Sequence, residues 1–276
     1  MRARLRSEGR DSLSLSADDA WLREITPNPA RLLADMARKG YAHRMQAGRY
    51  LIETGSDAPH EKPLVEALEP LARTLLDKLG VPYYLSWHTA LFHYGLIEQQ
   101  ASTIYCGIPK AKSSARFGRF AVRFVKVSQD SFFGIEPALD FRQPVIMASA
   151  EKALLDSLVR PELVASYPVV VGAFQTAVDR SLLEPQRLVD YTIQVGSAAL
   201  ARRVGFLMDR YGLKGAEPLL ERIGPRRRFE AFRPGDPRDA GEPEPKWRLR
   251  IPSRIVLTAE NLKLSLIHIS EPTRPY

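Results

Sequence analysis

Side chains that could bind DNA gather in one short part of the sequence, between residues 28 and 49. They are Asn28, Arg31, Arg38, Lys39, His43, Arg44, Gln46 and Arg49. Arginine and lysine neutralise phosphates, and arginine and asparagine form paired hydrogen bonds with the edges of guanine and adenine. This combination indicates an interface with double-stranded DNA. A solvated basic face or a contact surface for another protein would use similar residues, and both alternatives remain open.

A helix must carry the first of these side chains. Asn28 is a suitable N-cap, Pro29 is tolerated at the first helical position, and Gly40 ends the helix. Its buried stripe is formed by apolar residues at helical spacing, namely Ala30, Leu33, Met36 and Ala37. A shorter helix precedes it, with Ser16 as the expected N-cap.

A two-stranded ribbon is predicted directly after this helix, with strands at 41–45 and 49–52 and a turn at 46–48. Helix, short linker, helix and ribbon is the order of a winged helix-turn-helix, in which the second helix enters the major groove. Asn28, Arg31 and Arg38 would then face bases from the helix. Cations closer to the phosphates would be Lys39, His43, Arg44 and Arg49.

The chain as a whole is predicted to be α+β, with two domains. The loop at 54–63 contains Gly55, Pro59 and Pro63 and separates a winged helix-turn-helix domain (1–55) from a larger mixed α/β domain (64–263) whose C-terminal part is helical. Residues 264–276 resemble translated sequencing adapter and are left out of the fold. The segment before residue 10 is short for a first helix. We therefore expect the natural protein to differ from this sequence at its N-terminus as well as at its C-terminus.

Helices and strands of the larger domain follow from periodicity. Helices are expected at 64–79, from Ser86 onward, and at 150–159, 169–180, 185–195 and 198–211. Strands are expected within 103–127, 132–141, 144–149 and 247–251. The polar residues 110–119 are predicted to form a hairpin loop, and 225–245 a longer loop.

Other candidate sites have simpler structural explanations. His88 and His93 are five residues apart, so they lack the i, i+4 spacing of zinc ligands on a helix and are interpreted as packed histidines. Glu151 and Lys152 could suggest a nuclease, but adjacent helical residues point in different directions. We therefore expect a structural helix in which Asp156 and Arg160 form an ion pair.

Nothing in the sequence amounts to a catalytic signature. Cys106 is the single cysteine, so an internal disulfide and a multi-cysteine metal site are excluded. We interpret Cys106 as a core residue. No phosphate-binding loop or nucleophile elbow occurs. The basic run at 224–229 (GPRRRF) is equally compatible with nucleic acid and with solvent. We expect a protein that is not an enzyme and needs neither cofactor nor metal.

Net charge and hydropathy favour a cytoplasmic protein with a polyanionic partner. The 276 residues carry a formal charge of +8, which favours nucleic acid first and an anionic membrane second. No apolar run is long enough to span a bilayer, and the basic N-terminus lacks the apolar segment of a secretory signal.

Several segments in a fixed order resemble the AbiEi-type antitoxins of the AbiE type IV toxin–antitoxin system, over about residues 11–260. They are LLADMARKGYAHRMQAGRYLI, YYLSWHTALFHYGLIEQ, STIYCGIP, VRFVKVS, FFGIE and ASAEKALLDSL. The resemblance implies a winged domain that binds inverted repeats upstream of its own operon and represses it. It also implies a larger domain that opposes a nucleotidyltransferase-like toxin without forming a stable complex.

Three other functions are compatible with the residues. The first is a nuclease or transferase targeted by the winged domain, which would need Mg²⁺ between carboxylates drawn from Asp130, Glu136, Asp140, Glu151 and Asp156. The second is a transcriptional regulator without a toxin partner. The third is an interaction module whose ribbon is buried against another protein.

Overall fold

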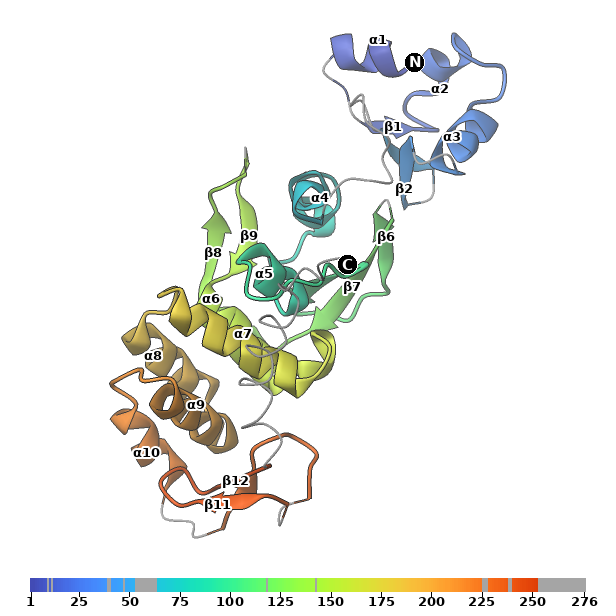
Figure 1. Cartoon of the computed structure of the whole chain (residues 1–276). Helices are drawn as coiled ribbons and strands as arrows, with labels where there is room; N and C mark the ends of the chain where they lie inside the picture. The colour runs from blue at the N-terminus through green and yellow to red at the C-terminus, as the bar shows by residue number, and fades with distance from the viewer. Residues whose placement is uncertain are drawn as a thin grey trace, which may run out of the picture. The chain divides into compact units, whose positions relative to one another are not determined.

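The chain has a mixed α+β fold in a computed structural model (Figure 1), as the sequence predicts. The structure describes residues 1–252 except 9, 11, 39–40, 47, 53–63, 118, 142, 225–227 and 238–239. The chain divides into two compact units. The first comprises Met1–Thr89, Gln99–Gln129 and Ile135–Met147, and the second comprises Ala90–Glu98, Asp130–Gly134 and Ala148–Tyr276. The predicted domain boundary at 54–63 lies outside the described residues.

The N-terminal region of the first unit packs short helices on a small antiparallel sheet. Its elements are α1 (Arg2–Ser7), β1 (Ser12–Ser14), α2 (Asp19–Arg23), α3 (Pro29–Arg38), β2 (Ala42–Gln46) and β3 (Arg49–Ile52). The strand order is β1-β3-β2. A buried cluster that includes Leu5, Leu22 and Leu33 holds helices and strands together. The predicted helix and ribbon are confirmed, and β1 adds a third strand.

The predicted cap of the short helix is wrong. Helix α2 begins at Asp19 rather than near Ser16, whose hydroxyl lies 3.1 Å from that of Ser14. The carboxylate of Asp18 instead accepts a hydrogen bond from the backbone N–H of Ser14 at 2.6 Å and binds Arg10. Asp18 therefore closes the turn that leads from β1 into α2.

A six-stranded mixed sheet dominates the rest of the first unit. Its strand order is β6-β7-β5-β4-β9-β8, formed by β4 (Tyr84–Leu85), β5 (Thr103–Ile108), β6 (Ala115–Phe117), β7 (Phe120–Lys126), β8 (Ile135–Ala138) and β9 (Val145–Ala148). β5 and β7 are parallel, so residues 110–119 are not the predicted hairpin loop. They contain β6, which pairs antiparallel with β7 and reverses the chain.

The predicted helix at 64–79 is confirmed in extent but is not one regular helix. It comprises α4 (Leu64–Leu71), a π-helical turn (Ala72–Leu76) and a 3-10 turn (Asp77–Leu79). Pro70 lies inside α4 and has no N–H to donate, which accounts for the irregular hydrogen bonding around it. Gly80, with φ 66°, ends the segment. Helix α5 (His88–His93) follows β4.

The second unit is mainly helical, with a small sheet at its end. It contains α6 (Ala150–Val159), α7 (Tyr167–Asp179), α8 (Pro185–Val195), α9 (Ala198–Arg210), α10 (Glu217–Ile223), β10 (Glu230–Ala231), β11 (Glu242–Glu244) and β12 (Leu249–Ile251). The hydroxyls of Ser149 and Ser197 cap α6 and α9. Helix α10 was not predicted. Among the described residues, no helix combines the length and hydropathy needed to cross a membrane.

Candidate nucleic-acid interface

Helix α3 places Asn28 and Arg31 at its exposed N-terminal end. The carboxamide oxygen of Asn28 accepts a hydrogen bond from the backbone N–H of Arg31 at 3.1 Å, so the predicted N-cap is confirmed. Leu33 on the opposite side is fully buried in the N-terminal core. This burial fixes the orientation of the helix and leaves Asn28, Arg31 and Arg38 exposed to solvent.

The two exposed arginines of α3 differ in their electrostatic surroundings. Arg38 forms an ion pair with Asp35 three residues earlier, with side chains 77% and 40% exposed. The Arg31 side chain forms no ion pair or hydrogen bond within the part of the chain that the structure describes. Arg31 is therefore available to an anion without first breaking a contact, whereas Arg38 shares its charge with a carboxylate.

The ribbon adds two further exposed cations, Arg44 and Arg49. Arg44 pairs in register with Tyr50, and Arg49 pairs with Gln46 beside the turn. Neither arginine forms an ion pair among the described residues. Lys39 lies outside the described residues, as do the side chains of His43 and Gln46. Of the eight predicted DNA-binding residues, the structure thus describes the surroundings of five: Asn28, Arg31, Arg38, Arg44 and Arg49.

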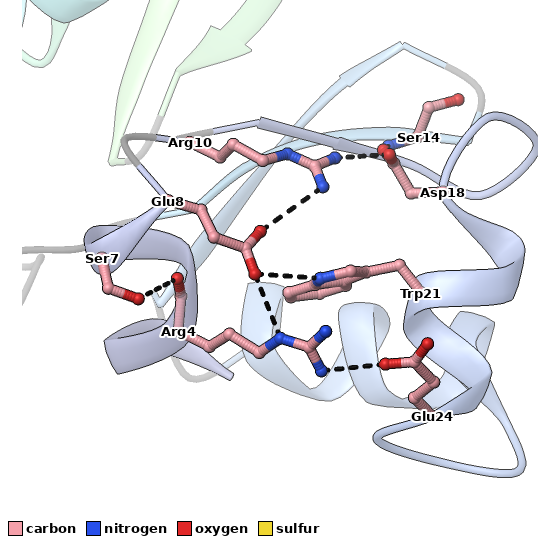
Figure 2. A network of polar contacts seen from close by, with 8 residues as sticks. All are labelled: Arg4, Ser7, Glu8, Arg10, Ser14, Asp18, Trp21 and Glu24. Atoms are coloured by element: carbon pink, nitrogen blue, oxygen red, sulfur yellow. Dashed lines mark hydrogen bonds and ion pairs between the residues drawn. The ribbon is translucent and has the colours of Figure 1, made fainter.

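Arg4 and Arg10 are neutralised in a network that sequence reasoning missed (Figure 2). Arg4 binds Glu8 at 3.1 Å and Glu24 at 2.9 Å. Among the contacts that raise the pKa of Arg4, the hydrogen bond with Glu24 has the greatest effect. Arg10 binds Asp18 and lies 3.8 Å from Glu8. This network ties α1 to the β1–α2 turn and neutralises Arg4 and Arg10.

Trp21 is at the centre of the same network. Its ring lies 5.1 Å from the guanidinium of Arg4 and 5.5 Å from that of Arg10, and its Nε1 donates to Glu8 at 3.4 Å. Arg23 on the same helix is paired with Asp19. The alternation of arginine with acidic residues over 4–24 is the sequence feature that could have predicted this network. Because Arg4, Arg10 and Arg23 are paired with carboxylates, they are less available to an anion than Arg31, Arg44 and Arg49 are.

The histidines and the cysteine do not form a metal site in the described part of the chain, where no cluster of three potential ligands is found. His88 is buried, and desolvation is the main cause that lowers its pKa. His93 packs edge-to-face on Tyr94. Cys106 is fully buried, and this burial raises the pKa of its thiol, so its interpretation as a core residue is confirmed.

Glu151 and Lys152 each have a different set of partners. Glu151 is fully buried and accepts hydrogen bonds from Ser149 Oγ at 2.9 Å, Glu184 N at 2.9 Å and Arg187 Nη2 at 3.0 Å. Lys152 binds Asp156 and lies 5.0 Å from the ring of Phe133. The carboxylates of Glu151 and Asp156 are therefore both engaged by cations of the second unit.

The ion pair predicted between Asp156 and Arg160 is replaced by two others. Asp156 binds Lys152, and Arg160 binds Glu162 at 3.0 Å. Arg160 is the C-terminal cap residue of α6, so it has left the helical geometry that an i, i+4 pair requires. In the basic run at 224–229, Arg228 is exposed, and residues 225–227 lie outside the described residues.

Comparisons with known proteins address the fold. No protein-family model matches the chain, and no curated protein matches its sequence. The crystal structure of the RV2827C protein from Mycobacterium tuberculosis aligns with a TM-score of 0.64 and 16% sequence identity, over 94% of this chain and 93% of that chain. The two chains share a fold. At this level of identity, the likeness carries no statement about function.

Proposed function

We propose that this protein is a DNA-binding transcriptional repressor whose N-terminal region acts as a winged helix-turn-helix. The observation that carries the proposal is the distribution of charge over that region. Arg31, Arg44 and Arg49 are exposed and have no ion-pair partner among the described residues, while Arg4 and Arg10 are neutralised by carboxylates. Exposed, uncompensated arginines are suited to phosphate contacts.

The order of elements supports this mode of binding. In a winged helix-turn-helix, α2 and α3 form the motif and the N-terminal end of α3 approaches the major groove. Arg31 would then contact a base edge, for which guanine is the preferred partner of arginine. Arg44 and Arg49 on the ribbon would contact the phosphates beside the groove, and so would Lys39 and His43.

A more specific assignment follows from the sequence resemblance to AbiEi-type antitoxins. On that basis we propose that the protein represses its own operon at inverted repeats and opposes a nucleotidyltransferase-like toxin without a stable complex. Expression of the toxin from the neighbouring gene should arrest growth, and co-expression of this protein should restore it. If growth is restored only by variants that also form a complex with the toxin stable enough to purify, the proposal is contradicted.

DNA binding itself is tested by titrating the full chain against its own promoter at several salt concentrations. Arg44→Gln and Arg49→Gln should each lower the slope of log K against log salt by roughly one, because each removes one phosphate contact. Arg31→Gln should instead reduce discrimination between operator and altered sequences. Arg23→Gln is the matched control, because Arg23 is 62% exposed but paired with Asp19. Equal retention of the promoter by all variants would refute the docking mode.

A further inference from the structure

A second basic surface lies on the six-stranded sheet of the first unit, in a segment with no acidic residue. Residues 99–129 contain six cations and neither aspartate nor glutamate. The cations are Lys110, Lys112, Arg116, Arg119, Arg123 and Lys126. All six are exposed. A stretch this basic accounts for most of the net charge of +8, and the proposed operator contacts make no use of it.

The sheet register brings two of these arginines onto one face beside a tyrosine. Arg123 on β7 pairs with Tyr105 on the parallel strand β5. Arg116 on β6 pairs with Ala121, two residues before Arg123, so the two arginines are diagonal neighbours on that face. Alternate residues of these strands, including Ile104 and Val122, point to the opposite face and are fully buried. The exposed face is thus fixed by the hydrophobic core behind it.

Four of the six cations have no polar partner among the described residues. Lys110, Arg116, Arg123 and Lys126 form no ion pair or hydrogen bond through their side chains within the described residues. Lys112 lies 5.7 Å from the ring of Phe124, and Arg119 lies 4.9 Å from that of Phe120. This contrasts with the N-terminal network, where Arg4 and Arg10 meet carboxylates.

Protection of a sheet edge is the simplest alternative explanation, because charged residues on edge strands prevent pairing with other chains. It accounts for Arg116, since β6 is the edge strand. It also covers Arg123 and Lys126, because β6 pairs with β7 only over Phe120–Val122. It does not account for the partly exposed ring of Tyr105, which lies in register with Arg123 on the inner strand β5.

We propose that the face formed by Thr103, Tyr105, Arg116 and Arg123, defined here as the β5–β7 face, binds single-stranded RNA. Tyr105 is partly exposed, and its ring and hydroxyl make no contact of the hydrogen-bond or stacking kind among the described residues. A partly exposed aromatic ring next to an arginine on a sheet is the arrangement on which unpaired bases stack while cations follow the phosphates.

The shape and the hydroxyl groups of this face argue for RNA in single-stranded form. A duplex is read by an inserted helix or ribbon, whereas a sheet surface accommodates splayed bases. Thr103 lies two residues before Tyr105 on the same strand and points to the same face. Threonine and tyrosine hydroxyls can donate to and accept from a ribose 2′-OH, which DNA lacks.

The test measures binding of the full chain to a labelled oligouridine of about 20 nucleotides, a length suited to a few stacked bases. The double variant Arg116→Gln/Arg123→Gln should weaken RNA binding by about tenfold or more, because it removes two phosphate contacts. The control Lys78→Gln/Lys214→Gln removes the same charge from exposed sites elsewhere and should change binding less than about twofold. Equal losses in both double variants would overturn the proposal.

Stacking and RNA preference are tested separately. Tyr105→Leu should weaken RNA binding by about fivefold or more, and Tyr105→Phe should retain it because the ring is kept. Oligothymidine of equal length should bind more weakly than oligouridine, and a duplex of unrelated sequence should compete poorly. Equal binding of oligothymidine, or full competition by the duplex, would overturn the assignment to single-stranded RNA. Arg31→Gln, on α3, should leave RNA binding intact, so failure of the operator model is distinguishable from failure here.

Discussion

The carboxamide oxygen of Asn28 accepts a hydrogen bond from the backbone N–H of Arg31 at 3.1 Å. A paired contact with adenine would need this same oxygen together with the amide nitrogen. Capping and paired base recognition therefore share one atom, and its second lone pair is the one left for a base. Because the cap fixes the start of α3 and the direction of this oxygen, Asn28 acts first by positioning Arg31.

Replacement of Asn28 should show this positioning role. Asn28→Ala should destabilise the first turn of α3 by ~1 kcal/mol, the usual cost of losing an N-cap, which is about a fivefold loss of amide protection in hydrogen exchange. Asn28→Ser and Asn28→Asp keep a side-chain acceptor and should retain protection. If Asn28→Ala exchanges as slowly as the unmodified chain, the cap does not stabilise this helix.

If the protein binds DNA as proposed, breaking the ion pair between Asp35 and Arg38 should increase its affinity for the promoter. Asp35→Asn releases Arg38 and removes a negative charge from the surface that would face phosphates, so binding to the promoter should tighten several-fold at low salt. Arg38→Gln should weaken binding less than Arg31→Gln, because Arg38 must first leave its partner. Anisotropy titrations of the three variants measure both effects. Weaker binding by Asp35→Asn would contradict the proposed orientation of α3.

The part of the N-terminal region that the sequence predicts well depends on local signals. Asn28 and Pro29 specify the start of α3. Leu33, Met36 and Ala37 of the predicted stripe pack in the core, whereas Ala30 is exposed. Strand β1 has only the short alternation of residues 12–16 as a signal, and its place in the sheet depends on β3, where Leu51 pairs with Ser12. The same holds for Asp18, whose partner Arg10 is set by the turn after β1.

The direction of strand pairing in the large sheet could not be predicted from the sequence for a related reason. The alternating patterns of β5 and β7 are the same for a parallel and an antiparallel pair, and only the short strand β6 between them decides the direction. Local spacing also mispredicted the pair between Asp156 and Arg160, because the burial of Lys152 cannot be read from its neighbours. The exposure of the ribbon cations, in contrast, could be predicted from the sequence, since Arg44 and Arg49 are exposed without a described partner.

Burial of Glu151 predicts a large effect on stability at a residue that belongs to neither proposed binding site. Glu151→Ala removes the acceptor of Ser149 Oγ, of Glu184 N and of Arg187, and it leaves a cavity in the second unit. Arg187 is 35% exposed and can regain water, so the expected loss is about 2–4 kcal/mol, near the lower end for a broken buried pair. Denaturant titration followed by circular dichroism measures it.

An exposed pair in the same unit provides the control for Glu151. Glu162 binds Arg160 with a side chain that is 60% exposed, so Glu162→Ala should cost less than about 0.5 kcal/mol. Promoter binding should persist in both variants under conditions where they remain folded. Equal losses of stability would show that the network around Glu151 stabilises no more than a surface pair does.

His88 makes the stability of the first unit dependent on pH. The side chain is 5% exposed, and desolvation is the largest cause that lowers its pKa below the ordinary 6.5. The unfolded chain therefore takes up a proton on His88 at a pH where the folded chain does not, so the unfolding free energy must fall as the pH drops below about 6.5. His88→Gln should lose this part of the pH dependence between about pH 7.5 and 5.5, while His93→Gln should keep it. Thermal melts across that range decide the point, and parallel curves for His88→Gln and the unmodified chain would mean that His88 does not titrate with folding.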